Sequence, residues 1–262
     1  MTVSKPTAFA IAAHPDDIEL MMAGTLLLLG EAGYDLHVMN ISNGSCGSMT
    51  ENADSTAARR TNEARASADL MGAYFHPPLT NDIEIFYEDS LLRKLAAVVR
   101  SVAPTILLAQ SPQDYMEDHM NACRLAVTAA FTRGMPNYRT DPATAPVDGS
   151  ITLYHALPWG LCGPLGERIW ARQFVNIETT LPKKRAALAC HQSQKEWLDQ
   201  TQGLDSYSDT METMSREVGE MSGQFEVAEG WRRHLHLGFC GPDDDPLTDA
   251  LGKNVFNVPE DE

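Results

Sequence analysis

Short apolar segments alternate with longer helical segments over the first 135 residues, and no other feature limits the fold so strongly. The segment Thr7–Ala13 is apolar after its first residue, which is typical of a strand buried on both faces of a parallel sheet. Strands and helices that alternate at this spacing form right-handed βαβ units. The sequence therefore predicts an α/β fold with a Rossmann-like, three-layer α/β/α architecture and a mainly parallel sheet.

The segments that carry this pattern have definite bounds. We expect strands at Thr7–Ala13, Asp35–Ile41, Thr105–Gln110, Ile151–His155 and Gln173–Ile177. We expect helices at Asp17–Glu31, Thr56–Met71, Ser90–Val102, Asp118–Thr132 and Leu181–Gln202. A loop rich in Gly, Ser and Asn covers Ser42–Ser55, and a late strand is expected within 231–239. The weakly periodic residues 203–225 predict a mobile flap or a loosely packed helix.

A chain of 262 residues is short enough to form one α/β domain. We expect residues 1–240 to form that domain, with 203–240 supplying the flap and the late strand. Residues 241–262 contain seven acidic residues and one lysine, and we predict an acidic C-terminal tail that is exposed or serves as an arm. In such folds a ligand binds at the carboxyl ends of the parallel strands, so the active site is expected there.

The charge balance narrows the choice of partners. Lys and Arg total 20 and Asp and Glu total 36, which gives a formal net charge of −16. Nucleic acids and anionic membrane surfaces attract clustered cations, so neither is expected as a partner. A small-molecule substrate fits this composition, and a homo-oligomer is compatible with it.

Two further features bear on location. No apolar run reaches the ~20 residues of a transmembrane helix, and the N-terminus lacks the layout of a secretion signal. The five cysteines are widely spaced and form no CxxC pair, which favours reduced thiols. We therefore expect a cytoplasmic protein with no transmembrane segment.

The sharpest motif, HPDDIE at residues 14–19, lies where the first buried strand ends and a helix begins. His14 and Asp17 are three residues apart, so one turn can aim both side chains at one point. An imidazole and a carboxylate are two of the three protein ligands of a catalytic zinc site, and Asp16 beside them can act as a base. The alternative is an acidic helix start with a hydrogen-bonded histidine.

A second polar segment, Asp114–His119, follows the strand at Thr105–Gln110. The carboxyl ends of parallel strands share one edge of the sheet, so His119 can supply the third metal ligand. The alternative is an ordinary surface histidine. Two such segments at the ends of two strands in one sheet favour the metal site.

The string AHPDDIE at residues 13–19 resembles the AHPDDxE signature of the PIG-L/LmbE-like family of zinc-dependent N-acetyl-sugar deacetylases. Further segments follow in the family's order. NGSCG at 43–47 resembles its DGxxG loop, RTNE at 60–63 its RxxE helix, and Asp118-His119 the end of its HPDH motif. Lys184 together with HQSQ at 191–194 resembles its later K…HxSQ helix.

The resemblance implies a reaction and a ligand set. His14, Asp17 and His119 would hold Zn²⁺, or another divalent ion, with one position open to water. Asp16 would act as general base and later pass the proton to the leaving amine. The product would be acetate, and the substrate an N-acetylated amino sugar or sugar conjugate of the N-acetylglucosamine type.

The resemblance also implies substrate contacts, and it has one departure. Arg60 would contact substrate hydroxyls or a neighbouring group, and Asp82 lies where the family often has a sugar-binding carboxylate. The family usually has a histidine that assists the oxyanion three residues before the last ligand, and here that residue is Met116. A thioether cannot donate a hydrogen bond.

We predict that Tyr115 is the replacement donor, and the alternatives are His155 or His191, reaching in from later segments. We also expect these two histidines among the substrate-binding residues. Two other functions stay open. One is an amidase for a different N-acyl or thiol-conjugate amide. The other is a catalytically weakened protein that binds a sugar or a metal, although binding alone has no need of a base at Asp16.

Overall fold

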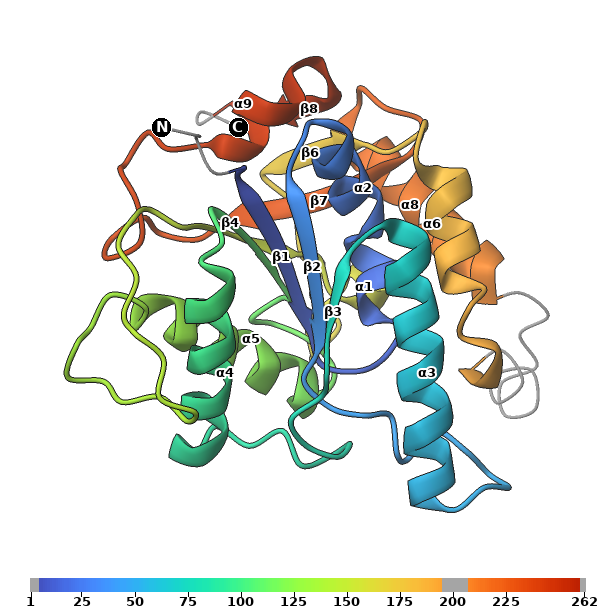
Figure 1. Ribbon diagram of the computed structural model, residues 1–262. Coiled ribbons are helices and arrows are strands. Elements are labelled where there is room, and N and C mark those ends of the chain that lie inside the picture. Colours follow the sequence, from blue (N-terminus) through green and yellow to red (C-terminus); the bar gives the residue numbers. More distant parts are fainter. Residues whose placement is uncertain (1–4, 195–206, 260–262) are drawn as a thin grey trace.

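The computed structural model describes residues 5–194 and 207–259. Its sheet has eight strands in the order β3-β2-β1-β4-β5-β7-β6-β8 (Figure 1). The strands are β1 (Thr7–Ala12), β2 (Asp35–Asn40), β3 (Tyr74–His76), β4 (Ile106–Ala109), β5 (Thr152–Ala156), β6 (Gln173–Asn176), β7 (Ala228–Arg233) and β8 (Val255–Asn257). The five strands from β3 to β5 are parallel to their neighbours, whereas β7 is antiparallel to both β5 and β6, and β8 to β6.

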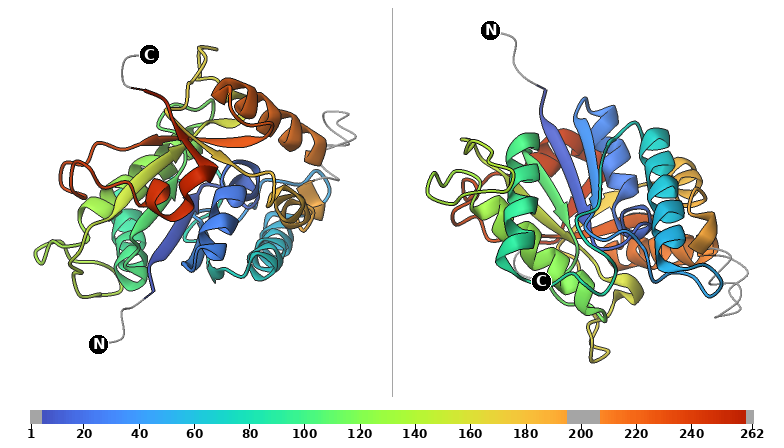
Figure 2. Two further views of the ribbon diagram at one scale, coloured as in Figure 1. Left: turned by 90° about the horizontal axis from the view of Figure 1, so that it is seen from above. Right: turned by 60° about the horizontal axis from the view of Figure 1, so that its bottom comes forward.

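Helices cover both faces of the sheet (Figure 2). They are α1 (Asp17–Met21), α2 (Ala23–Glu31), α3 (Ala53–Met71), α4 (Asp89–Val102), α5 (Glu117–Phe131), α6 (Leu181–Leu188), α8 (Tyr207–Ser222) and α9 (Pro246–Leu251), with short 3-10 helices η1 (Trp159–Leu161) and η2 (Gly252–Asn254). In Figure 1, α4 and α5 lie on one side of the sheet, and α1, α2, α3 and α6 lie on the other. The predicted three-layer α/β/α architecture is confirmed.

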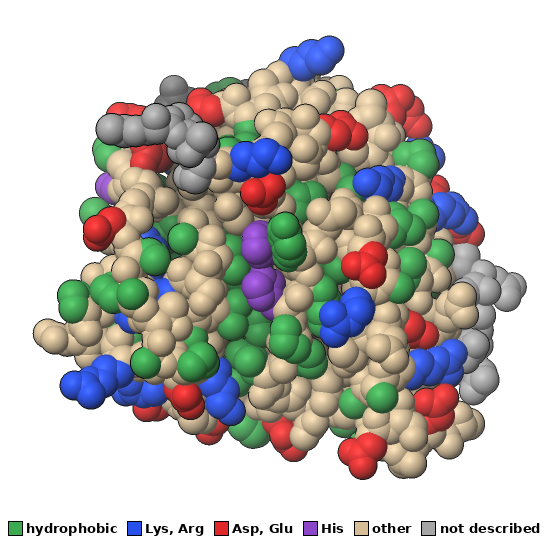
Figure 3. Space-filling view, in the orientation of Figure 1, with side chains coloured by type: hydrophobic (Ala, Val, Ile, Leu, Met, Phe, Trp, Pro, Cys, Tyr) green, Lys and Arg blue, Asp and Glu red, His purple; other side chains and the backbone are tan. Residues whose placement is uncertain are grey.

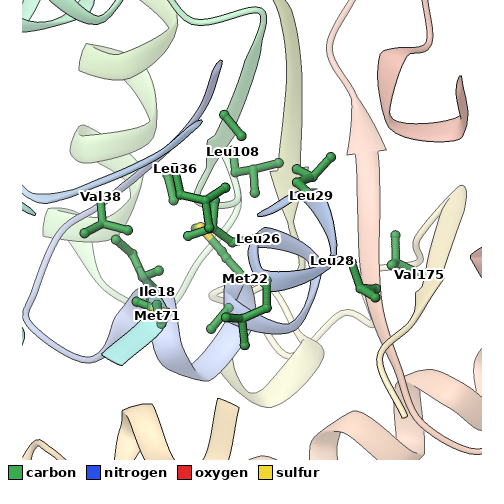
Figure 4. Close-up of a cluster of buried hydrophobic side chains, with 14 of the residues drawn as sticks. Ile18, Met22, Leu26, Leu28, Leu29, Leu36, Val38, Met71, Leu108 and Val175 are labelled. Carbon is green, nitrogen blue, oxygen red and sulfur yellow. The ribbon is translucent and has the colours of Figure 1, made fainter. Parts of the chain in front are cut away.

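Strand β1 joins the two halves of the core because its side chains alternate between the two faces. Ala8, Ala10 and Ala12 belong to a cluster with side chains of α2 and α3, part of which is drawn in Figure 4. Phe9 and Ile11 belong to a second cluster with side chains of α4 and α5. Burial on both sides explains why the whole strand is apolar.

The helix predicted at 17–31 is two helices, because a buried ion pair provides a second helix start. The carboxylate of Glu229 on β7 accepts hydrogen bonds from the backbone N–H groups of Gly24 (2.8 Å) and Thr25 (2.7 Å) in the first turn of α2. Lys184 of α6 donates to the same carboxylate at 2.7 Å. The carboxylate thus satisfies amides that would otherwise lack partners at a helix start.

The helix predicted at 181–202 is also interrupted. Helix α6 ends at Leu188, and His191 turns inward, where its Nε2 lies 3.2 Å from Oε1 of Glu19. This contact requires the chain to leave the helical path. Residues 195–202 lie outside the described residues.

The weakly periodic segment 203–225 contains a regular helix, α8. Met211, Met214 and Val218 recur at helical spacing, are buried and pack on the rest of the protein. The prediction of a loosely packed helix is thus correct in type, but one face of α8 belongs to the core. Residues 203–206 lie outside the described residues.

The C-terminal segment was predicted to be an exposed tail or arm, but it forms part of the sheet. The late strand predicted at 231–239 is β7, which begins earlier and ends at Arg233. In the acidic segment 241–262, Leu247 and Leu251 of α9 are buried, and β8 pairs with β6. These apolar residues lie between the acidic ones, so the charge count alone misses their burial. None of the described helices is long and apolar enough to span a membrane.

Candidate metal centre and active site

The site lies at the carboxyl ends of β1 and β4, which are adjacent and parallel. His14 follows β1, and Gln110 follows β4. The Gln110 side chain joins the two ends: its Oε1 accepts from the backbone N–H of Ala13 at 2.8 Å, and its Nε2 donates to Asp17 Oδ2 at 3.0 Å. Residues about a hundred positions apart are therefore held together by parallel pairing and one amide.

His14, Asp17 and His119 direct their donor atoms at a common point. Nδ1 of His14 is 3.2 Å from Nε2 of His119 and 3.6 Å from Oδ2 of Asp17. Nε2 of His119 is 3.5 Å from Oδ1 of Asp17. In a tetrahedral zinc site with bonds of about 2.0–2.1 Å, neighbouring ligand atoms are about 3.3 Å apart. The spacing in this site fits such an ion.

The outward nitrogens of both histidines contact carboxylates. Nε2 of His14 is 3.0 Å from Oδ2 of Asp118, and Nδ1 of His119 is 3.0 Å from Oδ1 of Asp114. Carboxylates in this position orient a metal-binding imidazole and raise its basicity. The arrangement leaves one nitrogen of each ring available for a cation.

The electrostatics of the site also favour a cation. Burial disfavours the charged form of His14, but the carboxylates of Asp118 and Asp17 raise its pKa to about 10. Burial acts to raise the pKa of Asp17, yet the imidazoles of His119 and His14 hold it below its usual range. The buried carboxylates thus draw positive charge to this point.

Asp16 lies beside the three candidate ligands without joining them. Its backbone is in the left-handed region (φ 112°), a strained conformation for a residue other than glycine. Oδ2 of Asp16 accepts from the Tyr207 hydroxyl at 2.6 Å and from Nη2 of Arg60 at 3.4 Å. Burial raises the pKa of Asp16, and the Arg60 guanidinium opposes that effect.

Arg60 and Asp82 hold the loop at 43–47. Asp82 accepts from the backbone N–H groups of Gly44 (2.7 Å) and Cys46 (3.0 Å), and its Oδ2 lies 3.8 Å from Nη1 of Arg60. Gly44 has a positive φ of 78°, and a Cβ there would lie 2.5 Å from Cδ of Arg60. A glycine is therefore needed for the arginine to pass.

These residues line a cavity of about 500 Å³. Its apolar wall is formed by Leu20, Met21, Ile83, Tyr115, Met116, Leu157, Trp159 and Tyr207. Tyr115 is half exposed, and its ring meets the His119 ring edge-on at 5.6 Å between centroids. Burial raises the pKa of Tyr115, so its hydroxyl keeps its proton. The volume suits a small organic ligand.

Arg60, Asp82 and Tyr115 line this cavity, whereas His155 and His191 do not. His155 Nδ1 is 3.0 Å from the carbonyl oxygen of Gln110, and its Nε2 is 2.9 Å from Nδ1 of His234, so it faces another cavity. His191 is buried behind the site beside Glu19.

Sequence reasoning missed two contributors to the site. Gln110 had a detectable signal, because it is a polar residue at the end of an apolar strand on the expected edge. Tyr207 had none, since only the packing of α8 brings it to Asp16, 191 positions away.

The comparisons with known proteins agree with this geometry. The family model described as GlcNAc-PI de-N-acetylase (PIG-L) matches residues 9–131, which include all three proposed metal ligands. This part of the chain is thus similar to the PIG-L family. The matched range ends before α8, so Tyr207 and the second half of the sheet lie outside it.

Two relatives of this chain are named for different activities. It is 26% identical to a diacetylchitobiose deacetylase of Thermococcus kodakarensis over 235 residues, covering 85% of this chain and 80% of the relative. It is 27% identical to a 4-oxalmesaconate hydratase of Pseudomonas putida over 203 residues, covering 74% and 76%.

Solved structures share the fold of this chain. The 4-carboxy-2-hydroxymuconate hydratase GalB from Pseudomonas putida superposes with a TM-score of 0.73 at 23% identity, covering 87% of this chain and 95% of that one. The N,N'-diacetylchitobiose deacetylase from Pyrococcus horikoshii also gives 0.73, at 22% identity, covering 89% and 85%.

Proposed function

We propose that this protein is a metal-dependent amide hydrolase that removes the N-acetyl group from an amino sugar or sugar conjugate of the N-acetylglucosamine type and releases acetate. The observation that carries the proposal is the convergence of His14, Asp17 and His119 on one point with the Asp16 carboxylate beside it. The deacetylase relative supports the substrate class.

His14, Asp17 and His119 would hold the metal, for which Zn²⁺ is our choice because two imidazoles and a carboxylate with an open position are typical of catalytic zinc. Such an ion supplies a Lewis acid that polarises an amide carbonyl and lowers the pKa of water. Everything else in the reaction falls to side chains of this chain.

Asp16 is placed to act as the base. In the part of the chain that the structure describes, both side-chain hydrogen bonds to its carboxylate fall on Oδ2. Oδ1 is therefore the oxygen that takes the proton of the attacking water and later gives it to the leaving nitrogen. Tyr207 and Arg60 keep the carboxylate oriented during both transfers.

The remaining residues of the cavity would bind the substrate. Tyr115 keeps its hydroxyl proton and is our candidate for the group that donates a hydrogen bond to the oxyanion. Met116 cannot serve in this role, because a thioether has no proton to donate. Trp159 offers an aromatic face to the apolar side of a sugar ring. Arg60 and Asp82 would contact substrate hydroxyls, as the sequence resemblance implies.

An acetate-release screen tests the proposal. The purified, metal-analysed protein is assayed with N-acetylglucosamine and its lipid-linked, thiol-linked and oligomeric derivatives. Release of acetate and a free amine from at least one is expected. Cleavage of only other N-acyl amides would support the amidase alternative. Tight sugar or metal binding without turnover of any amide would support the binding-protein alternative.

Hydration of a carbon–carbon double bond is the second candidate, favoured by the hydratase relative and by the absence of an oxyanion histidine at Met116. Arg60 is the one cationic residue of Lys or Arg type among the described residues lining the cavity, and its guanidinium already donates to Asp16 and to the Pro15 carbonyl. A polycarboxylate would thus find few free cations. Turnover of 4-oxalmesaconate, measured as the loss of its ultraviolet absorbance, would favour the hydratase function over the deacetylase function.

A further inference from the structure

A second cavity, of about 490 Å³, is lined in part by Pro112 of the segment that follows β4, whereas Ser111 and Asp114 of that segment line the first cavity. Helix α5 links the two cavities, because His119 faces the first and Cys123, one turn later, lines the second. We call it the arginine cavity after Arg124, Arg232 and Arg233 in its wall. Its volume is in the range of sites for small molecules.

Among the described residues, the wall of the arginine cavity contains no carboxylate. Its lining residues are Tyr87, Pro112, Cys123, Arg124, Val127, Thr128, His155, Arg232, Arg233, His234 and Leu235. Three arginines without an acidic side chain are unusual in a chain of net charge −16 with 36 acidic residues. The local composition is thus the reverse of the overall one, which points to an anion.

The three arginines are held in place without neutralisation. Within residues 5–194 and 207–259, none of them has a carboxylate of another side chain in ion-pair contact, unlike Arg93, Arg168, Arg185 and Arg216. Arg124 lies over the ring of Tyr87, with 4.7 Å from Cζ to the centroid. Arg232 donates to Oε1 of Gln113 at 2.9 Å, and Arg233 donates to the Asp244 carbonyl oxygen at 2.7 Å.

The histidines of this wall are already committed. His155 Nδ1 faces the Gln110 carbonyl oxygen and must donate to it, so its Nε2 accepts from Nδ1 of His234. Burial lowers the pKa of His155 to about 4, so the ring is neutral. Positive charge in the arginine cavity therefore comes from the guanidinium groups.

We propose that the arginine cavity binds a small organic or inorganic anion through Arg124 and Arg232, with a carboxylate or a phosphate as the recognised group. Guanidinium groups pair with both by paired, charge-assisted hydrogen bonds. Tyr87, Val127 and Leu235 supply apolar surface for the rest of such a molecule. This site is separate from the proposed deacetylation and does not depend on it.

Calorimetric titration of the full chain with inorganic phosphate and, separately, with succinate tests the proposal. Binding of at least one probe at millimolar concentration is expected, and the probe that binds more tightly identifies the recognised group. Sodium chloride of matched ionic strength serves as the reference. Absence of binding for both probes would overturn the proposal.

Variants locate the binding. Arg232→Gln and Arg124→Gln are each expected to weaken binding about tenfold or more, since each variant loses a charge-assisted hydrogen bond to the anion. Arg124 is exposed, so its replacement is compatible with folding. Arg172→Gln, an exposed arginine elsewhere, is the matched control and should bind as the wild type does. Equal affinity in all three variants would place the anion outside the arginine cavity.

Discussion

Asp16 and Asp17 are neighbours in the chain, yet their surroundings push their pKa values in opposite directions. Burial dominates at Asp16 and raises its pKa, whereas the imidazoles of His119 and His14 outweigh burial at Asp17 and lower its pKa. Two carboxylates whose environments separate them in this way suit different tasks. Asp17 suits a cation, and Asp16 suits the transfer of a proton.

The ligand set can be tested at His119. The wild type is expected to contain about one zinc ion per chain by mass spectrometry of the metal. His119→Ala should lose most of it, because two remaining ligands cannot hold the ion firmly. His236→Ala, a histidine outside the cavity, is the control. Full zinc content in His119→Ala would contradict the assignment.

The base can be tested at Asp16. Asp16→Asn keeps the shape of the side chain but cannot accept the proton, so turnover should fall by about 10²–10⁴. Zinc content should stay at the wild-type level, because Asp16 is not among the three converging ligands. Near-normal turnover would exclude Asp16 as the base.

At the scale of elements, the site depends on segments that approach from different layers. Strands β1 and β4 lead into the segments of the candidate ligands, α3 supplies Arg60, and α8 supplies Tyr207. Helix α8 also packs against β7, where Glu229 holds the start of α2. The elements outside the matched family range thus stabilise the first half of the sheet as well as completing the site.

The contribution of α8 to the site can be tested by replacing Tyr207. Tyr207→Phe removes the hydroxyl that donates to Asp16 at 2.6 Å and leaves the buried ring in place. We expect kcat to fall about tenfold, the value for one hydrogen bond to a charged group, with folding unchanged. Tyr74→Phe, on the exposed edge strand, is the control. A wild-type kcat for Tyr207→Phe would show that Arg60 alone orients Asp16.

The buried pair of Lys184 and Glu229 should contribute to stability. Lys184→Met leaves the Glu229 carboxylate without its cation in a buried place, which typically costs about 3–5 kcal/mol. Urea denaturation measures this loss. The exposed neighbour Lys183 gives the control Lys183→Met, for which we expect less than about 0.5 kcal/mol.

At the scale of the whole molecule, the two edge strands of the sheet are β8 and the short strand β3. Figure 3 shows histidine side chains beside hydrophobic ones near the middle of the face on which β3 lies. On β2 and β3, His37 and His76 stack at 5.1 Å between centroids, and their nitrogens are 2.8 Å apart. This pair has no room for two positive charges.

Global stability should therefore fall on mild acidification. Burial, and then the nearby His37, lower the pKa of His76 from 6.5 to about 4. Above pH 6.5 neither the folded nor the unfolded chain is protonated there, so the contribution is constant. Between about pH 6.5 and 4 the unfolded chain binds the proton first, so the free energy of unfolding decreases.

Chemical denaturation at neutral pH and near pH 5 measures this change. His76→Gln keeps a polar side chain but removes the titration, so it should lose less stability than the wild type over the same interval. Glu84→Gln, in the next loop, is the control. An identical loss in wild type and His76→Gln would show that His76 does not contribute.

Local patterns predicted the layers and most element types because they depend on neighbouring residues. The apolar run at Thr7–Ala13 predicted a buried strand, and the spacing of the following segments predicted parallel pairing. The pattern failed where distant residues meet: Glu229 caps a second helix start within 17–31, and beyond the end of α6 His191 lies beside Glu19. The count of acidic residues in 241–262 likewise predicted an exposed tail, but Leu247 and Leu251 of that segment are buried.

The amino-acid sequence by itself determined the class of fold, the sheet edge that carries the site, and the candidate ligands His14, Asp17 and His119, because residue type, periodicity and strand ends are local properties. Only the tertiary structure decided that Tyr207 contacts Asp16, that His155 faces the arginine cavity, and that α9 and β8 complete the sheet. These outcomes depend on which apolar surfaces pack against one another and are buried from water. Those contacts join segments that are far apart in the sequence, so they form only when the layers of the whole chain pack.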